Sequence, residues 1–380
     1  MTFRASPEQQ QLRDSVVRFV RDNASFERWQ KTVVAGQASA NTTWRQMADL
    51  GWLGIAVAEE HGGLGGSPFD TMVLMEALGA GFSLDPYVST CVLAPRLLEQ
   101  SPSADVAEIL AAIPEGRATV ALAVGEAGGG FELADVATRA TRNGDTFTVA
   151  GLKTYVPDGV DATHVIVPAR TAGAQHEPHG LTLLLVDAAS PGMSSSAFRS
   201  IDHRPVAHVQ FDEVIVPSHR VLGTIDHGYD LLQLAVDHAI AAELAEALGA
   251  MEAAADLTLK YIKTREQFGV QIGSFQALQH RMADIAIACE ETRSLVYHAT
   301  AQLGAPRPER RRAISAAKTR VGQCALFVGH QCVQLHGGIG TSDEMAVSHY
   351  MRRLRMLDMH FGNADFHRAI FAASGRAALS

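Results

Sequence analysis

A helical repeat of apolar residues continues from about residue 223 to the end of the 380-residue chain. The repeat is sustained over many turns in the stretches 228–265, 275–303 and 310–338. The last of these stretches ends at the glycine pair Gly337 and Gly338. Long helices joined by short loops pack antiparallel in an up-and-down bundle. Residues 223–380 are therefore predicted to form a C-terminal four-helix up-and-down bundle.

The middle of the chain, residues 118–222, has the composition of β-strands instead. Short runs rich in Val, Thr and Leu are bounded by turn residues at 119–126, 147–156, 163–170, 181–187 and 208–217. Asn143-Gly144-Asp145 is typical of a hairpin turn. Spacing near ten residues without intervening helices predicts an antiparallel sheet or barrel. No GxGxxG motif follows a strand, which argues against a nicotinamide dinucleotide site.

Residues 1–117 are again predicted to be helical. Ser6 is placed to cap the first helix and Pro7 to occupy its first position. The whole chain is thus expected to be an α+β multidomain protein with domains at 1–117, 118–222 and 223–380. The order is an N-terminal α-helical domain, a middle antiparallel β-domain and the C-terminal bundle.

Composition excludes several classes of protein. A formal net charge of −9 and a pI near 6.0 argue against binding to nucleic acid, which favours a basic face. No run of apolar residues is long enough to predict a membrane span, and the N-terminus lacks the features of a signal peptide, so a cytoplasmic protein is expected. The four cysteines are scattered and apolar-flanked, which predicts reduced core residues, and no metal site is predicted.

Several motifs are more specific than these patterns. The chain contains EQQQLRDSVVRFV at 8–20, MADLGWLGIAVAEEHGGLGG at 47–66, FDEVIVPSHRVLG at 211–223, TREQFGVQIGSFQALQHRMAD at 264–284 and QCVQLHGGIGTSDE at 331–344. Together they resemble the acyl-CoA dehydrogenase family over nearly the full length of the chain. The resemblance implies the fold of that family, and α,β-dehydrogenation of an acyl-CoA thioester with FAD as cofactor. It also implies electron-transfer flavoprotein as the electron acceptor.

Members of this family are usually tetramers in which each FAD lies at a subunit boundary. One chain holds the flavin ring, and its neighbour clamps the ADP half. The positions that match the clamp are Arg265, Phe268, Gln276, Gln334, Gly337 and Gly338. An arginine offers a charged fork of donors to a diphosphate, and glycines let the backbone approach a ligand closely. The alternative is that Arg265 is only a cation at a helix C-terminus and that the glycines only cap a helix.

The positions that match the flavin-ring pocket have changed. Gly125 stands where the family has a threonine that bonds the ring, and Phe131 replaces a small hydroxyl residue, although Glu126 remains. Pro157 replaces a second threonine and can offer neither a hydroxyl nor an N–H group. Tyr155 stands where a tryptophan stacks on the ring, and either ring contact or a plain strand end is open for it.

The catalytic base of the family is also missing. Phe361 occupies the position of the usual glutamate, and Ala239 occupies the position used by other members. Glu243 and Glu246 lie on the same helical face as Ala239, where burial could raise the pKa of a carboxyl group enough for it to act as a base. The polar neighbours of Phe361 are expected to be surface caps and solvated charges, and helical phase directs His360 away from the base position. These neighbours are Asp358, His360, Asp365 and His367.

The leading hypothesis is therefore a subunit that keeps what it lends to a neighbour's FAD and lacks its own base. Within the family, the chain most resembles the small, non-catalytic subunits of heteromeric enzymes, including that of pimeloyl-CoA dehydrogenase. The segments that carry this likeness are LKTYVPDG, ALQHRMAD and HFGNADFHR. Two alternatives remain: a self-sufficient homo-oligomeric dehydrogenase with Glu243 or Glu246 as base, and a flavin-free acyl-CoA-binding or scaffold protein.

Overall fold

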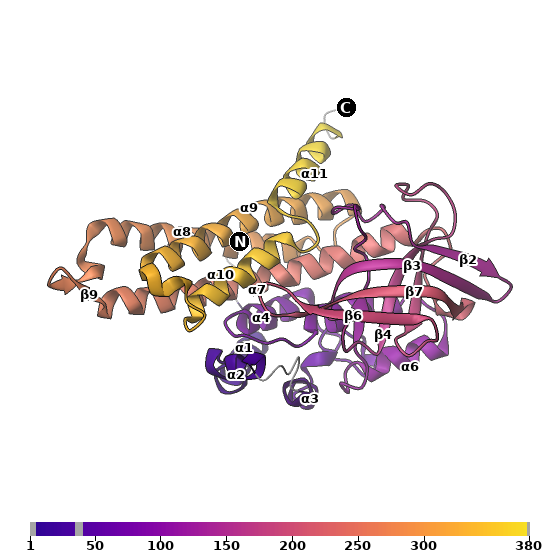
Figure 1. Cartoon of the computed structure of the whole chain (residues 1–380), viewed down its shortest axis with the longest axis horizontal. Helices are drawn as coiled ribbons and strands as arrows, with labels where there is room; N and C mark the ends of the chain where they lie inside the picture. The colour runs from indigo at the N-terminus through magenta and orange to yellow at the C-terminus, as the bar shows by residue number, and fades with distance from the viewer. Residues whose placement is uncertain (1–4, 35–40, 378–380) are drawn as a thin grey trace. The chain divides into compact units, whose positions relative to one another are not determined.

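A computed structural model describes residues 5–34 and 41–377 of the chain (Figure 1). Along the chain, helices are followed by a β-sheet and then by long helices, as the sequence predicts. Internal contacts divide the chain into two compact units. The helical unit comprises residues 1–35, 68–83 and 240–380, and the sheet unit comprises residues 36–67 and 84–239. The N-terminal helices are thus shared between the units, and the boundaries at 117/118 and 222/223 stay a prediction.

The first helix of the helical unit, α1 (Pro7–Asn23), begins as predicted. The Ser6 side chain accepts a hydrogen bond from the Gln9 backbone, and the Gln9 side chain accepts one from the Ser6 backbone, which makes a capping box. Helix α2 (Phe26–Val34) was not predicted, and α4 (Pro68–Gly79) packs against α1. Nearly every residue of α4 is buried, so its sequence carries no amphipathic pattern.

The three predicted long helices are confirmed as α7 (Gly228–Thr264), α8 (Gln276–Ala301) and α9 (Arg307–His336). Two shorter helices follow, α10 (Ala346–Met359) and α11 (Ala364–Ala377), and both pack against α9, as does α8. Figure 1 shows α8 and α9 running side by side at the end of the bundle that carries β9. Glycines also let α4 and α7 approach each other closely. A Cβ atom added to Gly79 of α4 would overlap the backbone at Glu246, and one added to Gly249 of α7 would overlap the backbone at Glu76.

The sheet unit carries α3 (Asn41–Asp49), α5 (Ala94–Leu98) and α6 (Ala104–Ala112). Its strands are β1 (Val120–Leu122), β2 (Arg139–Asn143), β3 (Thr146–Pro157), β4 (His164–Arg170), β5 (Leu181–Asp187), β6 (Met193–Arg199), β7 (Pro205–Pro217) and β8 (Val221–Leu222). They are ordered β6-β7-β3-β2-β4-β5-β8, with β1 paired to β4. A separate small hairpin joins β9 (Glu266–Gln267) to β10 (Val270–Gln271) in the helical unit.

The predicted sheet needs two corrections. It is not purely antiparallel, because β1 pairs with β4 in parallel and β2 meets β4 in parallel at one residue pair. Strands β2 and β6 were missed, since both are polar and largely exposed and lack the apolar alternation that marks a strand. The hairpin prediction is confirmed: Asn143 pairs with Thr146 across the two-residue turn Gly144-Asp145.

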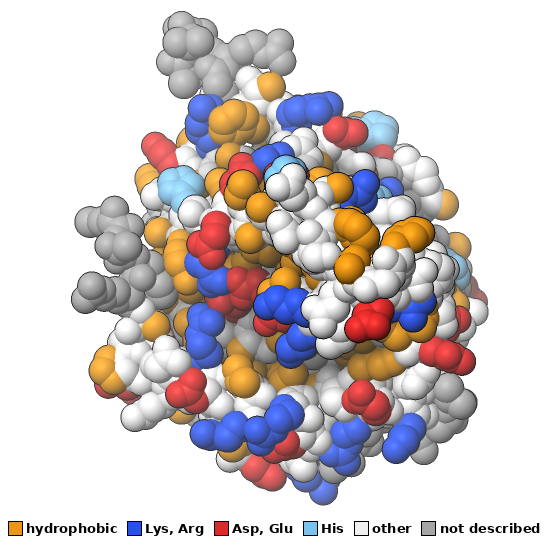
Figure 2. All heavy atoms as spheres, turned by 90° about the vertical axis from the view of Figure 1, so that its left-hand side faces the viewer, with side chains coloured by type: hydrophobic (Ala, Val, Ile, Leu, Met, Phe, Trp, Pro, Cys, Tyr) orange, Lys and Arg blue, Asp and Glu red, His pale blue; other side chains and the backbone are white. Residues whose placement is uncertain are grey.

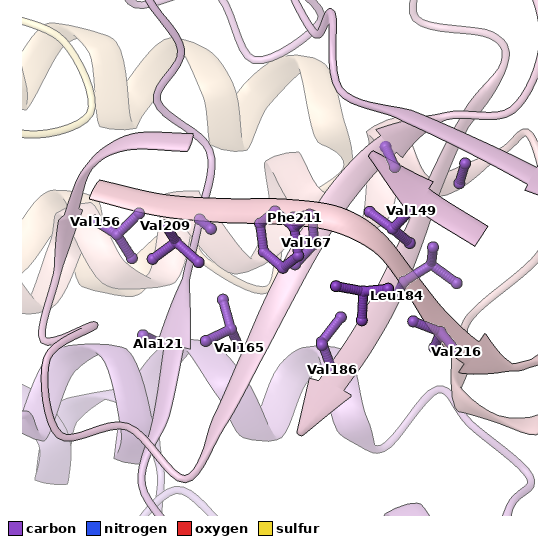
Figure 3. Close-up of a cluster of buried hydrophobic side chains, with 14 of the residues drawn as sticks. Ala121, Val149, Val156, Val165, Val167, Leu184, Val186, Val209, Phe211 and Val216 are labelled. Carbon is purple, nitrogen blue, oxygen red and sulfur yellow. The ribbon is translucent and has the colours of Figure 1, made fainter. Parts of the chain in front are cut away.

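The core of this sheet is a single cluster of Val, Ala, Leu and Phe side chains (Figure 3). Strands β4 and β5 contribute continuous buried runs, whereas β7 alternates between buried and exposed residues over much of its length. Figure 3 shows Phe211 and Val167 close together at the centre, with Val149 and Val216 at one end. Burying these side chains contributes roughly 1.5–3 kcal/mol for each large one.

All four cysteines are free and buried, as predicted. None of the helices within the described ranges is long and apolar enough to cross a membrane.

Candidate functional site

One candidate site lies at the hairpin that follows α7. Phe268 and Gly269 form its two-residue turn, and their φ angles are +56° and +78°. Two positive φ angles are typical of a type I′ turn, which favours Asn and Gly and strains other residues. The Phe268 side chain is nevertheless 91% exposed. Packing within the chain therefore does not explain why an aromatic residue occupies this strained position.

Polar side chains near this hairpin also face outward. Arg265, Gln276 and Gln334 are exposed, and none makes a side-chain hydrogen bond or ion pair with the described part of the chain. Gly337 ends α9 with a φ of +66°. A Cβ atom added to Gly337 or Gly338 would meet nothing within 4 Å. The backbone at this glycine pair is open to an approaching group.

Two contacts bring these motifs to the same end of the bundle. Tyr261 in the last turn of α7 stacks on His336 in the last turn of α9, with ring centroids 4.4 Å apart. The Arg265 carbonyl accepts a hydrogen bond from the Ile272 N–H, which closes the hairpin. Figure 2 shows hydrophobic side chains exposed among Lys, Arg, Asp and Glu on the side that β9 occupies in Figure 1. An unpaired guanidinium, exposed amides and open glycine backbone fit the anionic diphosphate of a dinucleotide.

The residues predicted for a flavin ring lie in the sheet unit. Tyr155 sits in β3 with a φ of +54°, where a bulge shifts the register between Lys153 and Val156. Its ring is 37% exposed, and its N–H donates to His208 Nδ1 over 3.3 Å. A Cβ atom added to Gly125 would overlap the Thr154 carbonyl. The backbone as it stands therefore has no room for the threonine that the family places at Gly125.

Glu126, which the family resemblance matches in the ring pocket, binds Lys153 of β3. Lys153 Nζ lies 2.7 Å from Glu126 Oε1, and the side chains are 0% and 7% exposed. The Glu126 carboxylate also accepts the N–H groups of Ala137 and Thr138. Burial lowers the pKa of Lys153 to about 8, although Glu126 favours its charged form. This pair joins the segment after β1 to β3, so its observed role is structural.

The structure changes the prediction for His360. Helix α10 ends at Met359, and His360 has an extended backbone, so helical phase does not govern where its side chain points. His360 Nδ1 and Glu243 Oε1 of α7 form a close hydrogen bond. Phe361 has a φ of +53° and stacks on the His360 ring, with centroids 3.9 Å apart. The imidazole thus lies beside a buried carboxylate at the turn where the family keeps its base.

Neither candidate base is a free carboxylate. Burial raises the pKa of Glu243, but His360, Lys318 and Arg353 together outweigh burial, and the net pKa is lowered. The expected raised pKa is therefore wrong. Glu246 is held by both Nε and Nη2 of Arg353, at 2.7 and 2.8 Å. Ala239, the other position of the family base, is fully buried.

The prediction of surface roles for the polar neighbours of Phe361 was wrong for three of the four residues. Asp358 is 4% exposed and accepts the N–H of Ala364 at the start of α11, so it is a buried cap. His367 is 0% exposed, and burial lowers its pKa to about 3. His360 binds Glu243, and only Asp365 is the predicted surface charge, paired with Arg368.

The sequence analysis did not single out two cations close to these acids: Arg353, which binds Glu246, and Lys318, which lines one cavity with Glu243 and Asp358. Lys318 of α9 and Arg353 of α10 lie within helical repeats and belong to no motif. A lysine or arginine on a helix usually faces solvent. Only the packing of α7, α9 and α10 brings these two residues to buried carboxylates, so the local sequence contains no signal for them.

The order of the elements, helices, then a mixed sheet, then long helices, is that of the acyl-CoA dehydrogenase fold. Models of the N-terminal, middle and C-terminal domains of acyl-CoA dehydrogenases match residues 6–107, 121–214 and 226–375. The chain therefore belongs to the acyl-CoA dehydrogenase family, whose members are FAD-dependent dehydrogenases.

Known proteins resemble the chain over its full length. The probable acyl-CoA dehydrogenase YngJ of Bacillus subtilis is 27% identical over 98% of this chain and 99% of its own. The structure of the steroid acyl-CoA dehydrogenase Tcur3481-Tcur3483 matches with a TM-score of 0.88 at 28% identity, covering 98% and 99% of the two chains. The ChsE4-ChsE5 complex of Mycobacterium tuberculosis matches with a TM-score of 0.89 at 25% identity, covering 99% of each chain.

Proposed function

We propose that this chain is a subunit of a heterotetrameric, FAD-dependent acyl-CoA dehydrogenase. It clamps the ADP half of a partner's FAD with Arg265, Phe268, Gln276, Gln334, Gly337 and Gly338. The observation that carries the proposal is that the polar side chains of this set are exposed and unpaired, beside an exposed Phe268 in a strained turn. Groups arranged in this way can serve a ligand held by another chain.

The partner chain supplies the base in this proposal. Glu243 is hydrogen-bonded to His360, Glu246 is paired with Arg353, and Phe361 and Ala239 offer no carboxylate. The loss of the ring contacts at Gly125 and Pro157 agrees with this division, since the partner's own pocket would hold the flavin ring. Tyr155 remains a candidate ring contact in this chain. Two structures that resemble this chain carry the names of pairs, Tcur3481-Tcur3483 and ChsE4-ChsE5, which supports a heteromeric assembly.

The substrate, the electron acceptor and the cellular location are proposed from membership in the family. The substrate is an acyl-CoA thioester, electrons leave to an electron-transfer flavoprotein, and the complex works in the cytoplasm. When bound, FAD supplies the acceptor for the hydride that leaves the acyl chain. The residues of this chain supply the charge and the open backbone that hold its diphosphate.

The clamp is tested on the complex of this chain with its partner. Arg265→Ala is expected to lower the flavin content, because an uncharged methyl group cannot bind a diphosphate. Flavin absorbance per complex is measured after size-exclusion chromatography. Lys263→Ala is the matched control, since it removes an exposed cation from the last turn of α7, two residues before Arg265. Unchanged flavin content in the Arg265→Ala complex would show that the clamp assignment is wrong.

The two alternatives give different outcomes when the chain is expressed alone. A yellow protein that reduces dye with acyl-CoA would support the self-sufficient enzyme, and loss of that activity in Glu243→Gln would identify the base. A protein that stays colourless with every candidate partner, yet binds acyl-CoA, would support the flavin-free scaffold. Colourless protein that becomes yellow and active only with a partner supports the leading proposal.

A further inference from the structure

The proposed clamp is made of two segments that lie far apart in the chain. One is the hairpin after α7, which carries Arg265 and Phe268, and the other is the glycine pair that follows α9. Both segments hold one diphosphate tightly only if their spacing is fixed beforehand, because ordering flexible groups on binding costs affinity. Residues that fix this spacing therefore contribute to the clamp without contacting the ligand.

An aromatic stack joins these two segments. The ring of Tyr261, in the last turn of α7, lies over the ring of His336, the last residue of α9, with 4.4 Å between the centroids and 22° between the planes. Stacked aromatic rings attract each other beyond the apolar area that they bury. Each ring is also next to its own clamp segment, since the Tyr261 carbonyl accepts the Arg265 N–H over 2.8 Å and the glycine pair directly follows His336.

The His336 ring is held in one orientation and one tautomer. The residue is 3% exposed, and its Nδ1 atom lies 2.8 Å from the Cys332 carbonyl oxygen. A carbonyl oxygen only accepts, so Nδ1 carries the proton and donates it. Burial lowers the pKa of His336, which keeps the ring neutral at pH 7, and Nε2 has no hydrogen-bond partner among the described residues. The polar bond of the ring stays within α9, and the stack is its contact with α7.

The glycine pair packs against His336 through the chain that follows it. The short helix η6 (Gly337–Thr341) begins directly after α9, and Gly340 within it is buried. A Cβ atom added to Gly340 would lie 2.9 Å from the His336 Cβ atom and would overlap the Val333 carbonyl. Helix η6 therefore lies directly on the end of α9. A displacement of His336 would move the glycine pair with it.

We propose that Tyr261 and His336 act as a positioning pair that sets the spacing between the arginine hairpin and the glycine pair of the clamp. In this role neither side chain contacts the ligand. The Tyr261 hydroxyl makes no hydrogen bond with the described residues, so the property that the pair requires is a flat ring at both positions. The inference rests on the proposed clamp and deepens it, because it identifies the residues that hold the clamp in shape.

The test is the rate at which FAD leaves the complex of this chain with its partner, followed by the rise in flavin fluorescence on release. Tyr261→Ala and His336→Ala should each speed release about tenfold, or about 1.4 kcal/mol, the scale on which a stacked pair contributes. Tyr261→Phe and His336→Phe keep a ring and should release FAD at the wild-type rate. His330→Ala is the matched control, because it removes an exposed histidine from the same helix.

A double variant distinguishes a positioning pair from two separate packing effects. If the rings act through each other, Tyr261→Ala/His336→Ala should release FAD no faster than the faster single variant. Rates that multiply would refute the pair, as would wild-type release from either alanine variant or fast release from both phenylalanine variants. Size-exclusion chromatography checks assembly first. Tyr261→Leu, which keeps most of the side-chain volume without a ring, replaces Tyr261→Ala if that variant does not assemble.

The result for the pair is separable from the result for the clamp. If Arg265→Ala lowers flavin content while Tyr261→Ala and His336→Ala release FAD at the wild-type rate, the clamp stands and the positioning pair is wrong. If Arg265→Ala leaves flavin content unchanged, the clamp itself is wrong, and the role given to the pair falls with it.

Discussion

The buried pair between Lys153 and Glu126 gives the sharpest prediction for the sheet unit. In Lys153→Met, a buried carboxylate keeps the N–H groups of Ala137 and Thr138 but loses its cation. Removing one partner of a buried ion pair costs about 3–5 kcal/mol. Because the two N–H groups still stabilise Glu126, we expect a loss of about 3 kcal/mol in the free energy of unfolding at pH 7. The double variant Lys153→Met/Glu126→Gln should recover much of this loss, since no unpaired charge remains.

The Lys153–Glu126 pair also makes the free energy of unfolding depend on pH, and the lowered pKa of Lys153 determines the sign of that dependence. The pKa of Lys153 is lowered from 10.5 to about 8 in the folded chain, first by burial. Between these two values the unfolded chain binds more protons than the folded chain, so stability from this group rises as pH rises. The rise is at most about 1.4 kcal/mol per pH unit and totals roughly 3 kcal/mol across the window. Below pH 8 both states hold the proton, and the cost of burying the charge is constant.

Urea unfolding followed by far-UV circular dichroism, at pH 7 and in steps up to pH 10, checks both statements. Wild type should gain stability from this group above pH 8, and Lys153→Met should lack that gain. Lys260→Met removes an exposed lysine and serves as the control, with an expected change within about 0.5 kcal/mol. The reasoning fails if Lys153→Met matches wild type at pH 7, or if the two proteins gain stability equally above pH 8.

Two further substitutions test the packing. Gly125→Ala places a Cβ atom against the Thr154 carbonyl and should lower the free energy of unfolding by about 1–3 kcal/mol in the same urea assay, whereas a neutral effect would show that the strand can shift. Glu246→Gln breaks a bidentate pair with Arg353 whose side chains are 8% and 19% exposed, so it should cost about 3 kcal/mol. A thermal melt checks this second effect, and an unchanged melting temperature would contradict it.

Local patterns were enough to predict most of the secondary structure. Ser6 and Pro7 marked the start of α1, the Asn143-Gly144 turn marked a hairpin, and sustained helical spacing marked α7, α8 and α9, because each signal is complete within a few turns of chain. The polar edge strand β6 and the parallel pairing of β1 had no such signal. Both depend on which strands become neighbours, and this is decided by the fold as a whole.

The chemistry of the base region was harder to predict because its partners lie far apart in the chain. Glu243 and His360 are 117 residues apart, and Glu246 and Arg353 are 107 apart. A carboxylate on the predicted open face of a helix can therefore already be bonded to a side chain that is distant in sequence. The motif at His360 was also interpreted with the wrong backbone, since the helix ends one residue earlier.

The clamp positions differ from the ring and base positions in whether their polar side chains have partners within the chain, and this difference bears on function. Around the clamp, the side chains of Arg265, Gln276 and Gln334 are exposed and have no hydrogen-bond or ion-pair partner in the described chain. The retained Glu126 of the ring pocket is instead buried and paired with Lys153, and Glu243, one turn from the empty base position Ala239, is buried and bonded to His360. A charged group that has an internal partner is stabilised by that partner and is less available to a ligand, whereas an unpaired exposed group keeps its full capacity to bind. Such a chain is suited to contribute to a site completed by another chain, and the clamp substitutions in the assembled complex test that division directly.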